Sequence, residues 1–183
     1  MKPLQDLFKG QLVRLCAPRP EDAEIIAGWT EDSAYQRPID TEPAKPASPQ
    51  AISRWFSSES NNSYYFHLRT LVEDRLVGFI VIHSIEWSNG RGVLSMGIGG
   101  TENRGLGYGS DALKLMLNYA FNELNLYRVG LDVIGSNTPA IHIYQRAGFK
   151  EEGRIRGAIN RDNTRVDLIL MGITRPEWEI RVD

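Results

Sequence analysis

The sequence predicts one α/β domain spanning residues 1–183, with a mixed, mostly antiparallel twisted sheet and helices on both faces. Three observations lead to this fold class. Short strand patterns separated by turn signals fill the first half, which indicates antiparallel strands. A strand, a glycine-rich loop, an amphipathic helix and a second strand follow, and this unit requires a parallel pair with a right-handed crossover. A final hairpin pattern ends the chain, whose length suffices for a full hydrophobic core.

The N-terminal third predicts one strand and two short helices. Residues 11–15 alternate polar and apolar side chains, as a half-buried strand does. Residues 21–29 follow as a helix with acidic residues in its first turn, where they complement the helix dipole. Residues 38–49 are rich in proline and alanine and predict a surface loop near a ligand. Residues 51–57 predict a second short helix.

Three antiparallel strands are expected next, at 64–71, 75–82 and 92–99. Glu73-Asp74 separates the first two as a hairpin turn. Asn89-Gly90 is a turn signature before the third. Gly78 lies inside the second strand pattern, which indicates a bulge or a close backbone approach.

The second half contains the clearest helix of the chain. Apolar residues recur at helical spacing from Gly109 to Leu124. Residues 128–134 predict a strand. The next helix opens with Asn137 as its cap and ends at Gly148. The last hairpin pairs 149–159 with 164–173 around Arg161-Asp162-Asn163, and its stretch 167–171 is apolar enough to predict a strand covered on both faces.

A glycine-rich segment precedes the long helix: Arg104-Gly105-Leu106-Gly107-Tyr108-Gly109-Ser110. Glycines allow close approach of the backbone to a ligand, and a helix N-terminus offers unpaired N–H groups, so the segment predicts a phosphate or pyrophosphate site. It lacks the lysine of a P-loop. Its spacing and its position after an antiparallel meander also differ from the dinucleotide-binding fold.

These residues resemble the GNAT superfamily of N-acetyltransferases. The segment beginning at Arg104 matches that family's Arg/Gln-x-x-Gly-x-Gly/Ala signature, and residues 137–149 resemble its Asn-x-x-Ala-x-x-x-Tyr-x-x-x-Gly-Phe motif. Residues 167–173 are similar to the branch that acetylates ribosomal-protein N-termini and related amines. The resemblance implies a splayed parallel strand pair and acetyl transfer from acetyl-CoA to a primary amine: a protein N-terminus, a polyamine or a small amine. The alternative is a non-catalytic acyl-CoA-binding regulatory or sensor domain.

The resemblance also implies roles for individual residues. The N–H groups of the glycine segment would bind the CoA pyrophosphate, and Arg104 would add positive charge. The pantetheine arm would lie between strands 92–99 and 128–134 and pair with backbone. Tyr144 would be the acid that protonates the leaving thiolate. The residues expected to bind the cosubstrate are Met96, Ile98, Gly99, Arg104, Gly105, Leu106, Gly107, Tyr108, Gly109, Ser110, Asn137 and Tyr144.

The general base stays open at this point. Related enzymes often place a carboxylate on the central strand where this chain has Ser95. Glu86 could act through a water molecule, and Asp132 is a weaker candidate. His67 and His83 lie on predicted strands, where a histidine is more often structural. The aromatic residues Trp29, Tyr35, Trp55 and Trp87 either line the acceptor pocket or belong to the core.

Bulk properties exclude several other classes. The net charge of −2 argues against a nucleic-acid or anionic-membrane partner. The lone cysteine, Cys16, allows no internal disulfide, and three scattered histidines predict no metal site. The N-terminus has no long apolar run, so we expect neither a signal peptide nor a membrane span, and a cytoplasmic location. A homodimer is a reasonable expectation for such an enzyme.

Overall fold

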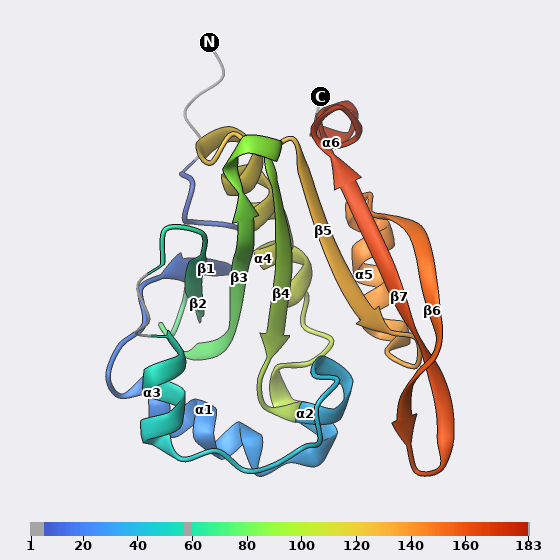
Figure 1. The fold of residues 1–183 in the computed structure, drawn as a ribbon. Coiled ribbons are helices and arrows are strands. Elements are labelled where there is room, and N and C mark those ends of the chain that lie inside the picture. The colour runs from blue at the N-terminus through green and yellow to red at the C-terminus, as the bar shows by residue number, and fades with distance from the viewer. Residues whose placement is uncertain (1–5, 57–59, 183) are drawn as a thin grey trace.

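The computed structural model describes residues 6–56 and 60–182; the extreme N-terminus and the expected helix end at Ser57 lie outside this part of the chain. The described strands form one seven-stranded sheet in the order β1-β2-β3-β4-β5-β7-β6 (Figure 1). Their bounds are β1 Val13–Cys16, β2 Tyr64–Thr70, β3 Leu76–Glu86, β4 Arg91–Ile98, β5 Arg128–Ile134, β6 Lys150–Arg161 and β7 Thr164–Thr174.

The pair β4–β5 is parallel, and every other neighbouring pair in the sheet is antiparallel. The parallel register runs only from Arg91, opposite Arg128, to Val93, opposite Gly130. Beyond this point the two strands diverge, as Figure 1 shows, and β5 pairs along its whole length with β7 instead. This confirms the mixed sheet with a splayed parallel pair.

Helices lie on both sides of the sheet, with bounds α1 Asp22–Thr30, α2 Ser33–Ile39, α3 Pro49–Phe56, α4 Tyr108–Asn118, α5 Thr138–Ala147 and α6 Arg175–Val182. In Figure 1, α4 and α5 lie behind the sheet, while α1, α2 and α3 gather at its lower end. Side chains of β2 alternate between these layers. Phe66 packs on Tyr119, just after α4, whereas Tyr65 and His67 face Trp55 and Phe56 of α3.

A buried ionic cluster fixes α1 to β2. The Asp22 carboxylate accepts hydrogen bonds from Arg69 and from His67 Nδ1, at 2.6 Å for the latter, and all three side chains are nearly inaccessible to solvent. Burial lowers the pKa of His67, which therefore stays neutral near pH 7. Its position supports the structural role expected for it.

The expected turns form because their residues permit the required backbone. Asp162 and Asn163 both have positive φ at the tip of the last hairpin, and Gly148 ends α5 with φ 108°. The Asn137 side chain caps α5 by accepting the Ala140 N–H at 3.3 Å. At Gly78 the neighbouring strand comes so close that an added Cβ would lie 2.3 Å from the Gly97 carbonyl oxygen. This confirms the close approach expected there.

Several features differ from expectation. Residues 33–39 form α2 despite the internal Pro38, because Asp32 caps the helix at the Ala34 N–H, 2.8 Å away. The last helix, α6, was not expected, and Trp178 anchors it against Phe121. Leu170 is 37% exposed, so β7 is not covered on both faces. The helix begun at Tyr108 changes to a wider π-type turn over Tyr119–Glu123.

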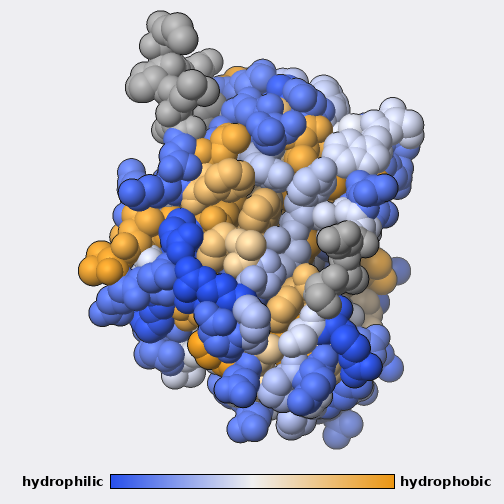
Figure 2. All heavy atoms as spheres, turned by 90° about the vertical axis from the view of Figure 1, so that its left-hand side faces the viewer, coloured by the Kyte–Doolittle hydropathy of each residue, from blue (hydrophilic) through white to orange (hydrophobic). Residues whose placement is uncertain are grey.

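Strand β1 forms one edge of the sheet. Figure 2 turns this side toward the viewer and shows apolar side chains lying between hydrophilic ones. Phe8 and Leu12, in the segment that leads into β1, are 45% and 42% exposed. None of the described helices has the length and hydrophobicity that a membrane crossing needs.

Candidate active site

A cavity of about 1020 Å³ opens where β4 and β5 diverge. Its walls come from both strands, the glycine segment, α2, α5 and the β6–β7 hairpin. The sequence-predicted site residues that line it are Ser95, Met96, Ile98, Arg104, Gly105, Gly107, Tyr108, Gly109, Ser110, Asn137 and Tyr144. Glu86, Gly99 and Leu106 do not line it.

The glycine segment forms a tight turn that leads into α4. Gly105 and Gly107 have φ of 74° and 86°, backbone angles that residues with a Cβ rarely adopt. Gly107 precedes α4 and carries no side chain that could cap it, so the first N–H groups of the helix are left for another acceptor. A Cβ added at Gly109 would lie only 3.2 Å from Met96 Cε, so the loop packs tightly against β4 here. The loop therefore presents backbone donors at the cavity wall.

The backbone of β4 faces the cavity at alternate residues. The Gly99 N–H donates to the Val77 carbonyl at 3.0 Å, and the Gly99 carbonyl accepts from Asn103 at 2.6 Å. Because strand groups alternate in direction, the N–H and carbonyl of Met96 and Ile98 point away from β3 and into the splay. These two residues, and not Gly99, can pair with an extended ligand. The structure corrects the expectation for Gly99.

Helix α5 places Tyr144 at the cavity. Its side chain is 8% exposed, and burial together with the negative charge of Asp132 raises its pKa to about 12. A phenol with this pKa keeps its proton at neutral pH. Asn137, at the start of the same helix, donates from Nδ2 to the Pro38 carbonyl at 3.1 Å, and its Oδ1 caps the helix.

The candidate bases separate clearly in space. Glu86 binds Arg91 at 2.5 Å and Asn89 at 2.7 Å, and these hydrogen bonds lower its pKa. It pairs with Arg91, four residues from Ser95 along β4, or roughly 13 Å at the strand rise. Glu86 therefore lies outside the cavity that Ser95 lines, and the geometry gives no support to its role as base. Ser95 lines the cavity and lies 3.0 Å from His83, which sequence reasoning treated as structural.

The segment from Arg37, at the end of α2, to residue 42 lies over one side of the cavity, and we call it the strap. Arg37 pairs with Asp162 at the tip of the β6–β7 hairpin, at 2.7 Å. Arg161 Nη2 donates to the carbonyls of residues 40–42 at 2.9, 3.2 and 3.1 Å. The first residues of the proline-rich segment, Pro38, Ile39 and Thr41, therefore line the cavity. Of the four candidate pocket aromatics, Tyr35 lines the cavity, and Trp29, Trp55 and Trp87 do not.

Asp111 is a supporting residue that sequence reasoning missed. It lies in the first turn of α4 and is only 9% exposed. Its carboxylate accepts three successive backbone N–H groups, from Gln11 at 3.2 Å, Leu12 at 2.8 Å and Val13 at 3.0 Å. This clamp holds the start of β1 against the helix that begins at the glycine segment. An acid in a first helical turn is common, so no sequence signal could have identified these partners.

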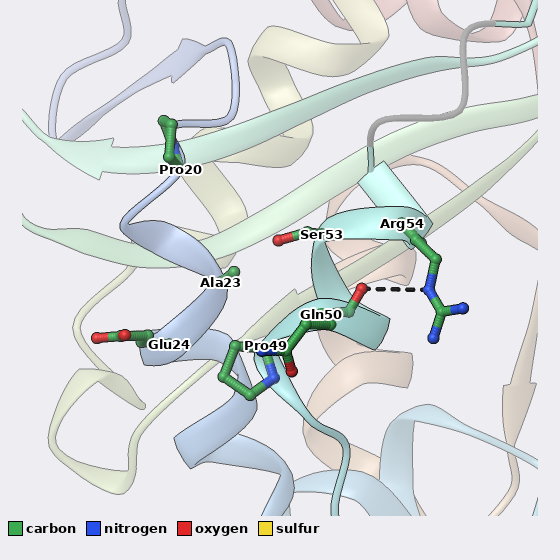
Figure 3. A pocket seen from close by; sticks show the side chains of 7 residues that line it. All are labelled: Pro20, Ala23, Glu24, Pro49, Gln50, Ser53 and Arg54. Atoms are coloured by element: carbon green, nitrogen blue, oxygen red, sulfur yellow. Dashed lines mark hydrogen bonds between the residues drawn. The ribbon is translucent and has the colours of Figure 1, made fainter.

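A second hollow lies between α1 and α3 and is shown in Figure 3. Its charged residues are Glu24 and Arg54, and Arg54 Nε donates to the Gln50 carbonyl of its own helix at 3.3 Å. It shares no residue with the larger cavity. Across the described ranges, no three His, Cys, Asp or Glu side chains are grouped so that they could hold a metal ion.

Comparisons with known proteins agree with this geometry. Residues 13–150 match the acetyltransferase (GNAT) domain family. The SPbeta prophage-derived uncharacterized N-acetyltransferase YokL of Bacillus subtilis is 25% identical over 173 residues, covering 94% of this chain and 96% of that protein. Spermidine N(1)-acetyltransferase of Escherichia coli K12 is 44% identical over 54 residues, which are 30% of this chain and 29% of that protein.

A solved structure shows the same fold. Spermidine N-acetyltransferase from Vibrio cholerae, in complex with CoA and spermine, superposes with a TM-score of 0.81 at 21% identity, covering 91% of this chain and 98% of that chain. The curated relatives named above are called N-acetyltransferases, so the non-catalytic CoA-binding alternative is not favoured. Because the family match spans residues 13–150, the chain belongs to the GNAT family and is an acetyl-CoA-dependent N-acetyltransferase.

Proposed function

We propose that the cavity between β4 and β5 binds acetyl-CoA with its pyrophosphate on the glycine segment and its thioester beside Tyr144. The divergence of these strands after Val93 carries the proposal, because it leaves backbone groups of Met96 and Ile98 without a strand partner. A pantetheine arm has amides that can pair with such groups. The first turn of α4 supplies donors for the pyrophosphate.

In this arrangement Tyr144 is the general acid. The amine nitrogen attacks the thioester carbonyl, the C–S bond breaks, and the departing thiolate takes the phenolic proton. The raised pKa of Tyr144 keeps that proton in place until the thiolate forms. A positioned acid of this kind contributes roughly a hundredfold or more to the rate.

The acceptor is a primary amine that carries one positive charge where it enters. Asp132 is the acid on the cavity wall that forms no ion pair or side-chain hydrogen bond within the described residues, since Asp162 is paired with Arg37. Four arginines also line the cavity: Arg37, Arg104, Arg146 and Arg161. A single unpaired carboxylate offers a partner for one ammonium group, which favours a protein N-terminus or a small monoamine over a polyamine with several charges.

The test is thiol release from acetyl-CoA with three acceptors: a peptide with a free N-terminus, a polyamine and a small monoamine. We expect turnover with at least one singly charged acceptor. Asp132→Asn should raise KM for the amine and leave the Kd of CoA unchanged. An unchanged kcat in Tyr144→Phe would refute the acid role of Tyr144, and absence of CoA binding would refute the cavity assignment. Turnover with the polyamine alone would refute the acceptor class.

A further inference from the structure

We propose that Ser95 and His83 form a proton relay in which His83 is the general base and Ser95 passes it the proton of the amine. The two residues lie on neighbouring antiparallel strands, with His83 on β3 and Ser95 on β4. His83 Nε2 lies 3.0 Å from Ser95 Oγ. The inference rests on the proposed function, because it needs the thioester to lie beside Tyr144.

Geometry gives each residue a distinct part. Ser95 is exposed and lines the cavity, so an incoming amine can reach its hydroxyl. His83 is half-buried behind it and does not line the cavity. A proton therefore travels from the amine to His83 through Ser95. His83 Nδ1 lies 3.0 Å from Ser84 Oγ, which can hold the tautomer in which Nδ1 donates and Nε2 accepts.

Electrostatics support this direction of transfer. Burial lowers the pKa of His83, so the imidazole is neutral at pH 7 and can accept a proton. Asp132, across the splay on β5, is the charged group that acts on it and opposes that shift. The same carboxylate raises the pKa of Tyr144. The charge on Asp132 thus stabilises the imidazolium that forms on His83, and it keeps Tyr144 protonated before the thiolate forms.

The proton balance closes over one turnover. The acceptor enters as an ammonium ion, so its nitrogen gives up two protons. The first passes to Ser95 Oγ while the Ser95 hydroxyl proton moves to His83 Nε2, and this leaves the neutral amine that attacks. The second leaves the nitrogen to solvent once the C–N bond has formed. The C–S bond breaks, and the thiolate takes the proton of Tyr144. His83 then returns its proton to solvent and Tyr144 regains one. Ser95 is not acylated at any step.

Two variants test the relay, His83→Ala and Ser95→Ala. We expect each to lower kcat with the accepted amine about 100-fold, with the Kd of CoA unchanged. Ser88→Ala, which removes an exposed serine hydroxyl that does not line the cavity, is the matched control and should keep the wild-type rate. Added imidazole should restore a large part of the rate to His83→Ala. It should not restore Ser95→Ala, whose His83 is intact.

The pH profile gives an independent readout. The acid limb of kcat in the wild type should contain the ionisation of His83, and this limb should disappear in His83→Asn. The relay is wrong if His83→Asn keeps the wild-type rate and limb, or if imidazole fails to restore His83→Ala. It is also wrong if Asp132→Asn, and not His83→Asn, removes the limb, since Asp132 would then be the base. A wild type that neither binds CoA nor turns over any amine overturns the proposed function itself.

Discussion

Removal of the Asp111 carboxylate should destabilise the fold strongly for a single substitution. In Asp111→Ala, three backbone N–H groups lose their acceptor. The Val13 group is buried, and an unsatisfied buried donor costs about 1–3 kcal/mol. The N–H groups of Gln11 and Leu12 are partly accessible and can bond to water instead, so the loss of each hydrogen bond costs only about 0.5–1 kcal/mol. We expect the free energy of unfolding to fall by about 2–5 kcal/mol.

Urea denaturation measures this effect. The midpoint should fall for Asp111→Ala without a change in the m-value, because the surface exposed on unfolding stays the same. Asp111→Asn keeps the shape and one acceptor oxygen but loses the charge, so about half of the loss is expected. Lys114→Ala, at an exposed position of the same helix, is the control and should change stability by less than about 0.5 kcal/mol. A change that small in Asp111→Ala itself would show that the carboxylate does not hold the strand.

Three further predictions concern the cosubstrate site, the acid and the C-terminal helix. Gly107→Glu places a negative side chain in the proposed pyrophosphate loop, and it forces a residue with a Cβ into a φ of 86°. Calorimetry should therefore detect no CoA binding at concentrations that saturate the wild type. Tyr144→Phe should lower kcat about 100-fold with the Kd of acetyl-CoA unchanged; an unaltered kcat would exclude the acid role. Hydrogen bonds from Lys150 and Thr174 lower the pKa of Glu177 to about 2, so its stabilising effect is present above its ordinary pKa and is lost as pH falls toward 2. Glu177→Gln should flatten the stability curve between about pH 4.5 and 2, and an unchanged slope in acid denaturation would contradict this.

Features set by neighbouring residues were predictable from the sequence. The cap at Asn137 and the glycine end of α5 depend on a few adjacent residues, and both form as expected. The exposure of Leu170 was not predictable, because an apolar stretch alone does not show which side of a sheet lacks a covering helix. Helix α2 carried a capping signal at Asp32, but the prolines that follow obscured it.

The same distinction explains why the sequence did not place Glu86 correctly relative to Ser95. Proximity in sequence suggested that Glu86 could act near Ser95 on the central strand. The hairpin register instead pairs Glu86 with Arg91, the first residue of β4. His83 is 12 residues from Ser95 and becomes its neighbour only through the pairing of β3 with β4. The register of a hairpin depends on its turn and on any bulge beside it, and here the register shifts between His83 and Glu86. A base supplied by a neighbouring strand therefore leaves no local pattern in the sequence.

The two halves of the cavity differ in how they are encoded, and this difference separates what the sequence predicts from what it does not. The side that we propose binds acetyl-CoA uses backbone groups: glycines with positive φ, a helix start and alternate residues of β4. Backbone geometry follows from local residue types, so a short motif can specify it. The proposed acceptor side uses side chains from β3, β4 and β5. The strap covers it and is held in place by hydrogen bonds from Arg161 of the β6–β7 hairpin. In the proposed arrangement, substitutions there change the accepted amine without altering the glycine segment that binds CoA. Related enzymes can then share the acetyl-CoA site and differ in acceptor.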